Sequence, residues 1–462
     1  MKRLILILIA LVLFCTYCIH AQIVKKPLSE TQQVIWGQAF ENNNLTRLPS
    51  KYQTTLPSDV WTKVVFPTGM QVRFRTNATS ITINYTSGTL FSYDYQSKIG
   101  ANGFDLYVHV DNEWHWVYPN SQSMAVGASS FTYGQIAPDD SDYSQHGYEY
   151  TLYLPSICQV SDLSITLNTG ASFEYIPVTT NEKPIVFYGT SIINGMTVSR
   201  PGNNITNIVS RSLYNTNIVN MGFRSVARME SEVVAALNKI DAQIYFIDCL
   251  PNMNSSALTA EILIRYVAAV DTLKKYHPNA AIVLVEHPGY SYQEIYSHRK
   301  TTVENVNKEL SIAYQQLQAK SYSYIYYLTQ EELGIDLTTD FSDHIHPNDK
   351  GSYQYANAFL TKIRQIRQDF LVSEIPIDNE LELKIYPKII SNGYFNIECK
   401  IRTDENLQMA IYDLFGRNIM KSADINKHTN TIDVSDLNEG MYIVTVGNSR
   451  KENIAAKIII KK

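Results

Sequence analysis

The alternation of hydrophobic and polar residues changes twice along the chain, and each change indicates a new domain. From about residue 36 to 175, short segments such as "SITINYT" and "FDLYVHV" alternate apolar with polar residues and are separated by Gly, Asn, Ser and Asp. A period of two places one set of side chains in a core and the other in solvent. This region is therefore predicted to form an all-β sandwich or jelly roll.

From about residue 183 the pattern becomes one of continuous apolar runs separated by segments with helical spacing. The runs "PIVFYG", "QIYFIDCL", "AAIVLVEH" and "YSYIYYL" are typical of parallel strands that are covered on both faces. Segments such as "RMESEVVAALNKI" lie between them. Strands that alternate with helices predict an α/β domain with right-handed crossovers, which ends near residue 370.

After "SEIPIDNE" short β segments return, including "LELKIYP", "GMYIVTV" and "AAKIIIKK", and they predict a small β-sandwich. No internal repeat or low-complexity run interrupts this order. The predicted boundaries are a leader at 1–21, a first β domain at 22–180, an α/β domain at 181–372 and a second β domain at 379–462.

The first residues predict a secretory signal peptide. Two basic residues are followed by an apolar run to about Cys18, and the small Ala21 precedes the expected cleavage point. The run is short for a membrane span. A lipid anchor on Cys15 or Cys18 is the rival interpretation, and it is disfavoured because the bulky Phe14 and Tyr17 precede these cysteines. The mature protein is therefore expected to be secreted or at the cell surface.

Composition and charge narrow the possible partners. Of the 462 residues 18% are charged, the formal net charge is −5, and no block of Lys or Arg stands out, so no nucleic-acid or anionic-membrane partner is expected. Cys158, Cys249 and Cys399 remain after the leader, an odd number in distant segments. No disulfide framework is expected, and ordinary hydrophobic cores must hold the domains.

Candidate chemistry is concentrated where strands of the predicted α/β sheet end. Ser191 follows the first apolar run, Gly222 follows "NTNIVNM", Asn252 follows "QIYFIDCL", and Asp343 and His346 occur in "FSDHIHPND". In open α/β sheets, binding sites form outside the carboxyl ends of the strands. One sheet is therefore expected to gather these five residues.

These residue types suit acyl transfer. A serine needs a base to become a nucleophile, and histidine serves near neutral pH when a carboxylate fixes its tautomer. Ser191, His346 and Asp343 would supply that set. The backbone N–H groups of Ser191 and Gly222, together with the side-chain amide of Asn252, would stabilise the oxyanion.

Simpler interpretations apply to each residue alone. Ser191 can serve as a helix N-cap, Gly222 as a turn and Asn252 as a loop residue with local hydrogen bonds. His344 and His346 form an H-x-H pair, which can bind zinc. No H-E-x-x-H motif and no cysteine cluster accompanies this pair, so no metal or other cofactor is expected.

The blocks "GTSI", "NMGF", "DCLPNM" and "SDHIHP" occur in the order found in the SGNH or GDSL-like hydrolases, and residues 184–370 resemble that superfamily. The resemblance implies a flavodoxin-like parallel sheet. It also implies a catalytic set of Ser191 as nucleophile, His346 as base and Asp343 as its partner, with Ser191, Gly222 and Asn252 as the oxyanion hole. "GTSI" replaces the usual Gly-Asp-Ser and "LPNM" the usual Gly-x-Asn-Asp, and these departures bear on the substrate more than on the mechanism.

Two further motifs, "SRPG" from Ser199 and "GFDLY" from Gly103, resemble a bacterial branch of carbohydrate-associated esterases and their N-terminal β domain. Arg200, Asp248 and Glu286 are candidate substrate-binding residues, although a surface pair for the arginine and local hydrogen bonds for the carboxylates would account for them equally well. The first β domain is expected to assist substrate binding.

An aromatic stripe marks the first β domain. In "EWHWVYP" alternate positions place Trp114, Trp116 and Tyr118 on one strand face. Large aromatic side chains dominate protein cores, so this stripe is more typical of a sandwich core than of a platform on which sugars stack.

The last domain resembles the sorting domain of type IX secretion in Bacteroidetes-like bacteria. The segments "YDLFGR", "LNEGMYIV" and the terminal "KIIIKK" carry the resemblance, whereas "YPKI" replaces the usual start. The resemblance implies secretion machinery as a partner of this domain. An accessory β domain is the alternative.

Together these features predict a secreted serine esterase that removes O-acetyl or similar short acyl groups from an acylated polysaccharide or oligosaccharide. The carbohydrate part of this prediction follows from the resemblance. A lipase-like or lysophospholipase-like esterase is the nearest alternative. A carbohydrate-binding protein that has lost activity is an alternative of a different class, and the intact Ser191, Asp343 and His346 argue against it.

Overall fold

The chain forms two compact units, 1–359 and 360–462, and the boundary between them falls within helix α11 (Asp349–Ser373). The computed structural model describes residues 23–40, 44–111, 113–119, 121–122, 124–138, 141–179, 182–373, 381–401, 407–413, 417–425, 430–447 and 453–461. The predicted leader, with the two cysteines of the rival lipid anchor, lies outside these residues. No helix in this part of the chain is both long enough and apolar enough to cross a membrane.

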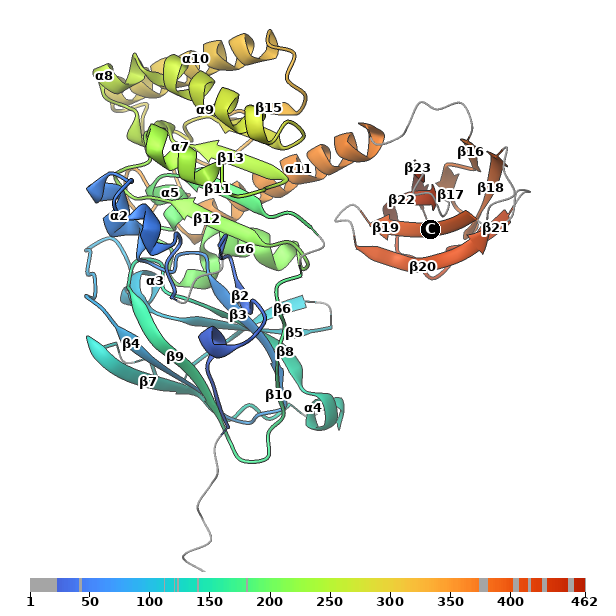
Figure 1. Ribbon diagram of the computed structural model, residues 1–462, viewed down its shortest axis with the longest axis horizontal. Helices are drawn as coiled ribbons and strands as arrows, with labels where there is room; N and C mark the ends of the chain where they lie inside the picture. Colours follow the sequence, from blue (N-terminus) through green and yellow to red (C-terminus); the bar gives the residue numbers. More distant parts are fainter. Residues whose placement is uncertain are drawn as a thin grey trace, which may run out of the picture. The chain divides into compact units, whose positions relative to one another are not determined.

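The first unit begins with a β-sandwich of two sheets (Figure 1). One sheet contains, in spatial order, β1 (Ile23–Lys25), β9 (Val160–Leu167), β4 (Ile81–Ser87) and β7 (Gly127–Tyr133). The other contains β10 (Phe173–Tyr175), β3 (Gln71–Thr76), β8 (Tyr148–Tyr153), β5 (Asp105–Val110) and β6 (Glu113–Val117), with β2 (Ile35–Trp36) beside β3. Burial alternates residue by residue along β4, which confirms the predicted period of two.

Short helical segments connect the strands of the sandwich. They are η1 (Pro27–Ser29), η2 (Ser50–Tyr52), α2 (Ser58–Val64), α3 (Lys98–Asn102) and α4 (Ser141–His146). The inward side chains of the two sheets form one core, in which Ile83 from the first sheet and Leu106 from the second are fully buried.

The α/β part of the same unit is built on a parallel sheet. Its strands, in spatial order, are β12 (Ile218–Gly222), β11 (Ile185–Gly189), β13 (Ile244–Asp248), β14 (Ala281–Val285) and β15 (Ile325–Leu328). Every residue of the first four of these strands is buried, as the continuous apolar runs predict. Numbered along the chain the order is 2-1-3-4-5, which confirms the flavodoxin-like arrangement.

Helices cover both faces of this sheet. They are α5 (Ser191–Asn194), α6 (Ile205–Ser212), α7 (Ser231–Leu237), α8 (Ser256–Thr259), α9 (Ile262–Tyr276), α10 (Ser297–Gln318) and α11, with single turns η3 (Pro201–Asn203) and η4 (Leu250–Asn252). On one face Val186 and Tyr188 share a core with residues of α7, α9 and α10. On the other face the rings of Phe187 and Phe246 lie 5.1 and 4.7 Å from that of Phe359 in α11.

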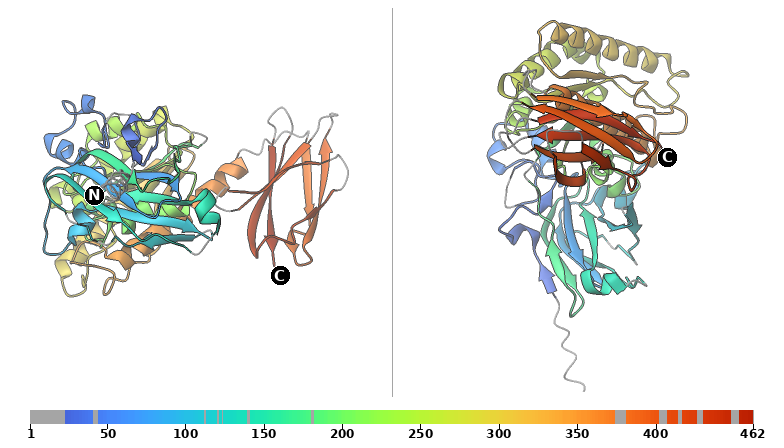
Figure 2. Two further views of the ribbon diagram at one scale, coloured as in Figure 1. Left: turned by 90° about the horizontal axis from the view of Figure 1, so that it is seen from below. Right: turned by 90° about the vertical axis from the view of Figure 1, so that its right-hand side faces the viewer.

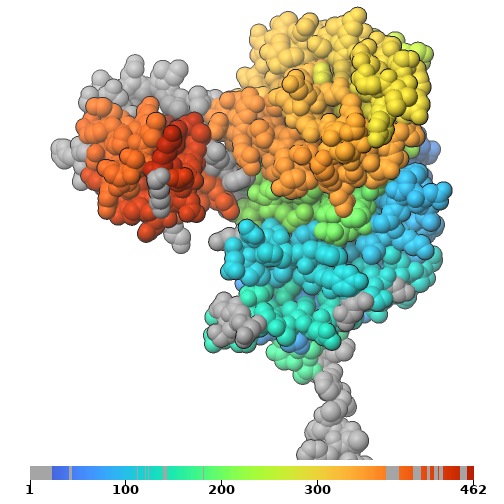
Figure 3. Space-filling model, turned by 180° about the vertical axis from the view of Figure 1, so that it is seen from behind, coloured from blue at the N-terminus to red at the C-terminus, as the bar shows by residue number. Residues whose placement is uncertain are grey.

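The sandwich and the α/β part share buried polar contacts, which accounts for their forming one unit. Gln71 Nε2 and Arg73 Nη2 of β3 both donate to Ser210 Oγ of α6, at 2.5 and 3.0 Å. Tyr153 Oη of β8 donates to the carbonyl oxygen of Asn207 at 3.3 Å. In the space-filling view the cyan surface of the sandwich continues without a break into the green and orange surface of the α/β part (Figure 3).

The second unit is a small β-sandwich (Figure 2). Its sheets are β16 (Leu381–Tyr386), β18 (Tyr394–Ile401) and β21 (Asn430–Asp433), and β17 (Ile389–Ile390), β23 (Asn453–Ile460), β22 (Gly440–Gly447), β19 (Leu407–Asp413) and β20 (Asn418–Ile425). Phe395, Ile397, Val444 and Ile458 are fully buried in its core. This is the small sandwich that the sequence predicts, although part of "YDLFGR" lies outside the described residues.

Candidate active site

Ser191 stands at the junction of a strand and a helix. Strand β11 ends at Gly189, and α5 begins at Ser191. Thr190 occupies the N-cap position, where its Oγ1 accepts a hydrogen bond from the Ile192 N–H at 3.3 Å. The interpretation of Ser191 as the N-cap is therefore wrong: its neighbour caps the helix, and the Ser191 hydroxyl is left for another partner.

That partner is His346. Ser191 Oγ lies 2.8 Å from His346 Nε2, and His346 Nδ1 lies 2.8 Å from Asp343 Oδ2. Because the carboxylate can only accept, Nδ1 carries the ring proton of a neutral imidazole, and Nε2 accepts the hydrogen of the serine hydroxyl. The fold thus joins three residues that are up to 155 positions apart into one hydrogen-bonded chain.

The loop that carries the histidine is organised around Asp343. Its Oδ1 accepts hydrogen bonds from the N–H groups of Ile345 and His346, at 2.7 Å each. Burial alone would raise the pKa of Asp343, but the hydrogen bond and charge of the His346 ring, together with these two N–H groups, lower the pKa to about 2. Asp343 therefore stays ionised over the pH range in which a histidine titrates.

The segment that follows α5 also forms hydrogen bonds with the loop of His346. Thr197 Oγ1 donates to the carbonyl oxygen of Pro347 at 2.8 Å. The N–H and the hydroxyl of Ser199 donate to Asp349, at 2.8 and 2.5 Å. Since Pro347 and Asp349 follow His346 closely, the segment after α5 fixes the position of the loop relative to Ser191.

The predicted oxyanion donors are only partly available. The single N–H of Gly222 donates to Asn220 Oδ1 at 2.8 Å, so it has no hydrogen left for an oxyanion in this conformation. A Cβ at Gly222 would lie 2.4 Å from the Asn194 nitrogen, so this glycine is required for the close approach of α5 to β12. Asn252 Nδ2 donates to the Val226 carbonyl oxygen, and its second hydrogen remains.

The prediction from sequence missed Tyr95, a residue of the sandwich. Its ring lies parallel to that of His346, with centroids 6.2 Å apart and an interplanar angle of 14°. Tyr95 is 43% exposed, so it forms an open wall beside the histidine and is not part of a core. The alternating aromatic residues of "FSYDYQ" are the signal that could have found it.

Two predicted substrate-binding carboxylates are occupied elsewhere. Asp248 is fully buried, and its Oδ2 accepts from Tyr355 Oη at 2.9 Å; burial raises its pKa to about 7. Glu286 accepts hydrogen bonds from Tyr327 Oη at 2.8 Å and from the Gln330 N–H at 2.6 Å. Both carboxylates hold neighbouring elements together, so the structure supports the local alternative.

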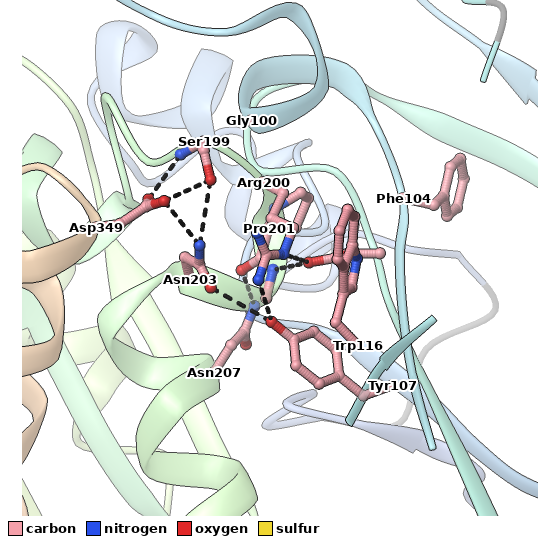
Figure 4. A network of polar contacts seen from close by, with 12 residues as sticks. Gly100, Phe104, Tyr107, Trp116, Ser199, Arg200, Pro201, Asn203, Asn207 and Asp349 are labelled. Carbon is pink, nitrogen blue, oxygen red and sulfur yellow. Dashed lines mark hydrogen bonds and ion pairs between the residues drawn. The ribbon is translucent and has the colours of Figure 1, made fainter. Parts of the chain in front are cut away.

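Arg200 belongs to a network between the sandwich and the α/β part (Figure 4). Its Nε lies 3.3 Å from Asp105 Oδ2, its guanidinium carbon lies 4.3 Å from the Trp116 ring centroid, and its Nη2 donates to Tyr107 Oη at 3.2 Å. Asp105 also accepts from the Gly202 N–H at 2.9 Å and from Trp116 Nε1 at 2.6 Å. The motifs "GFDLY" and "SRPG" therefore bind each other, and Arg200 contacts the sandwich.

The aromatic stripe of β6 is not sandwich core, so the favoured prediction for it is wrong. Trp116 is 43% exposed and Tyr118 is 69% exposed. The ring of Trp114 lies against His109 and, at 6.4 Å, against Tyr214 of the α/β part. Trp114 and Trp116 line the junction between the two parts because the opposite face of β6, which carries Val117, is the one turned to the core.

The described residues contain no group of three or more His, Cys, Asp or Glu side chains that could hold a metal ion. His344, the second member of the H-x-H pair, is exposed. Its backbone carbonyl oxygen accepts from the Ser291 N–H at 3.2 Å.

Three family models match successive segments of the chain. Residues 25–173 match the N-terminus of SGNH-hydrolase-type esterases, residues 182–364 match the GDSL-like lipase/acylhydrolase family, and residues 384–461 match the secretion system C-terminal sorting domain. The chain is therefore a carboxylic ester hydrolase whose α/β part belongs to the GDSL-like lipase/acylhydrolase family. The sorting domain places it among proteins of type IX secretion, outside the cell or at its surface.

Solved structures share this fold. A GDSL-like lipase candidate from Bacteroides ovatus is 24% identical, with a TM-score of 0.66, over 75% of this chain and 98% of the other. A salicylyl-acyltransferase from a tetracycline biosynthetic pathway is 16% identical, with a TM-score of 0.58, over the same shares of the two chains. No curated protein matches the chain significantly.

Proposed function

We propose that the protein is a serine esterase that removes short acyl groups, acetyl foremost, from polysaccharide, with Ser191 as nucleophile, His346 as base and Asp343 as its partner. The observation that carries the proposal is the hydrogen-bonded chain of these three residues, with both links at 2.8 Å. A hydroxyl, an imidazole and an ionised carboxylate in this sequence are the parts that acyl transfer requires.

In the first half of the reaction Ser191 Oγ attacks the carbonyl carbon of the ester, and its proton passes to His346 Nε2. The ionised Asp343 stabilises the imidazolium that forms, because its low pKa keeps it charged. The tetrahedral intermediate then collapses as the imidazolium gives its proton to the departing sugar hydroxyl. In the second half His346 removes a proton from water, which attacks the acyl-enzyme and releases the acid and the free Ser191 hydroxyl.

The oxyanion needs N–H donors near Ser191. The N–H of Ser191 belongs to the first turn of α5, where backbone N–H groups have no partner within the helix. Asn252 would offer its second amide hydrogen. In place of Gly222 we propose the N–H of Ser225, an exposed residue of the loop after β12 with a φ of +60°, because strained backbone of this kind is common at active sites.

Two observations favour a sugar ester over a long-chain lipid ester. The wall beside His346 is the exposed ring of Tyr95, and the neighbouring ring along this loop is Tyr93, 5.5 Å away. Tyrosine rings present both an apolar face and a polar tip, which suits the mixed surface of a sugar. The sorting domain would also deliver the enzyme to the cell surface or the outside of the cell, where polysaccharide substrates occur.

Labelling with a fluorophosphonate followed by mass spectrometry tests the mechanism. We expect one adduct, on Ser191, and its loss in His346→Ala. Ser191→Ala should abolish most turnover, and Asn252→Ala should lower kcat by about a hundredfold to a thousandfold. Ser231→Ala is the matched control, because Ser231 is likewise the first residue of a helix, α7. Full activity in Ser191→Ala would refute the proposal.

A series of chromogenic esters of increasing acyl length tests the substrate class. A preference for acetyl or propionyl supports the proposal, and a preference for long chains supports the lipase alternative. Binding of polysaccharide with no adduct and no turnover would instead support the carbohydrate-binding alternative.

A further inference from the structure

Arg224 is a cation in the loop after β12, the strand next to β11, which ends at Gly189 just before Ser191. Its guanidinium carbon lies 4.6 Å from the ring centroid of Phe91, 5.6 Å from that of Tyr93 and 5.7 Å from that of Phe66. Its Nη1 donates a hydrogen bond to Tyr93 Oη. The side chain is thus held in one position by the sandwich, from which all three rings come.

The same rings lead from this cation to the proposed base. The ring of Phe91 is parallel to that of Tyr93 at 6.4 Å, and Tyr93 stacks on Tyr95 at 5.5 Å. Tyr95 in turn stacks on His346 at 6.2 Å. The segment from Phe91 to Tyr95 is therefore an aromatic wall with the imidazole at one end and Arg224 at the other.

In the described part of the chain no carboxylate pairs directly with Arg224, although the charges of Asp94 and Asp343 act together with it on the pKa of Tyr95. Among the described residues it forms no ion pair, although it is only partly exposed, and its Nε is buried without an acceptor. Two other cations stand near it: burial and then the charge of Arg224 lower the pKa of Arg47, to about 9, and that of Lys63. Asp59 is the carboxylate that opposes this effect at Lys63.

Local charge and geometry therefore favour an anion at this end of the wall. A partly buried guanidinium without a counter-ion is costly, and a carboxylate that pairs with it recovers that cost. The planar guanidinium matches a carboxylate in two-point hydrogen bonds better than a lysine does.

We propose that Arg224, with Tyr93 and Tyr95, forms a subsite for a carboxylate of the substrate, so that the enzyme acts on esters that carry a negative charge near the acyl group. This inference rests on the proposed function, since it names the substrate class of the same site. The carboxylate has two possible sources, an acidic sugar that bears the ester or an acyl group that itself ends in a carboxylate.

Four substrates separate these sources. An acetylated uronate oligosaccharide is compared with its neutral acetylated counterpart, and a 4-nitrophenyl succinate monoester with 4-nitrophenyl acetate. In the wild type we expect a higher kcat/KM for the charged member of at least one pair. The pair that shows the preference identifies the source, and equal values in both pairs would overturn the proposal.

Substitution of Arg224 tests its role in the preference for charged substrates. Arg224→Gln should lower the ratio of kcat/KM between the charged and the neutral substrate by about tenfold to a hundredfold, mainly through KM, and Arg224→Lys should restore part of it. Arg75→Gln is the matched control, because it removes the same charge from β3, where Arg75 donates to the Gly147 carbonyl oxygen. A ratio that Arg224→Gln leaves unchanged would show that the arginine only supports the wall.

Inhibition of the wild-type enzyme keeps the proposal falsifiable if the variants do not fold. Free glucuronate or succinate should compete with 4-nitrophenyl acetate more strongly than glucose does, and the difference should shrink as salt is added. Equal inhibition by acid and neutral sugar, with succinate inactive, would refute the subsite. Turnover that survives Ser191→Ala would instead refute the proposed mechanism, so the two failures are distinguishable.

Discussion

Two aspartates of the first unit accept similar numbers of hydrogen bonds and yet differ in charge behaviour. Asp343, in the loop of His346, accepts from the imidazole and from two backbone N–H groups, and its pKa falls to about 2. Asp105, in the junction with the sandwich, accepts from Gly202 and Trp116 and pairs with Arg200. Burial nevertheless raises the pKa of Asp105 to about 7.

The difference lies in how much water each carboxylate keeps. The side chain of Asp343 is 16% exposed and that of Asp105 is 3% exposed. Loss of the remaining water disfavours the charged form more than two hydrogen bonds and an ion pair favour it. The carboxylate of Asp343, beside the proposed base, is therefore built to stay ionised, whereas the carboxylate of the junction changes charge near neutral pH.

The two regions are nevertheless connected through one short segment. Ser199 and Asn203 both donate to Asp349, and Gly202 of the same segment donates to Asp105 (Figure 4). One end of the segment therefore contacts the loop of His346, and the other end contacts the sandwich. Substitutions in the two regions should affect catalysis and stability differently.

The largest effect is expected for Asp343→Asn. The amide would favour the wrong tautomer of His346, and kcat should fall by roughly ten-thousandfold while the fold is retained. Steady-state kinetics with a short-chain ester measure this loss. The matched change Asp105→Asn should cost less than about tenfold in kcat, and similar losses in the two variants would contradict the division of roles.

A smaller loss is expected for Asp349→Asn. The amide cannot accept all three hydrogen bonds from Ser199 and Asn203, so the loop of His346 is held less firmly. We expect kcat to fall about tenfold with KM little changed, which is less than the roughly hundredfold cost of a 1 Å displacement. Asp241→Asn, at an exposed pair with Lys183, is the control. A rise in KM alone would argue against positioning.

The fold could be predicted from the sequence because its patterns are local. Continuous apolar runs such as Ile185–Gly189 and the alternation of Ile81–Ser87 depend only on which faces are covered. The stripe at Trp114 and Trp116 was misjudged because periodicity shows which residues share a face and not what covers that face. Here the α/β part contributes contacts that a sandwich considered alone does not have.

The candidate site was predictable in its residues but less so in its hydrogen bonds. Ser191, Asp343 and His346 were found because their strand-end positions and their chemistry agree. Gly222 was named as a donor, but the side chain that takes its N–H, Asn220, cannot be assigned from spacing. Tyr95 of the sandwich contacts His346 of the α/β part, and Arg224 of the α/β part contacts Tyr93 of the sandwich. Hydrophobic periodicity within one segment does not report contacts between segments that are far apart along the chain.

The pH dependence of stability tests the raised pKa of Asp105, the carboxylate of the junction. The pKa of Asp105 is about 7 in the folded protein against an ordinary value of 3.8, so the folded state binds more protons between these values. Stability should therefore fall as the pH rises from about 4 to about 7. Asp105→Asn should weaken this fall without removing it, because Asp248 titrates in the same direction. Thermal melting, monitored by the loss of esterase activity, measures the stability at each pH. If stability fell with pH as steeply in Asp105→Asn as in the wild type, the raised pKa of Asp105 would be contradicted.

The smallest effect is expected for Trp116→Phe, which removes one donor from Asp105 and keeps a ring over Arg200. Loss of one hydrogen bond while two other partners remain should cost about 1 kcal/mol in the free energy of unfolding. With one donor fewer, the charged form of Asp105 is less favoured, so its pKa should rise further and the fall in stability should extend to higher pH. The esterase activity should change little, because the ring lies at the junction and not beside His346. If Trp116→Phe lowered kcat as strongly as Asp349→Asn, the aromatic ring would have to act on the site directly, and the separation of the two networks would be wrong.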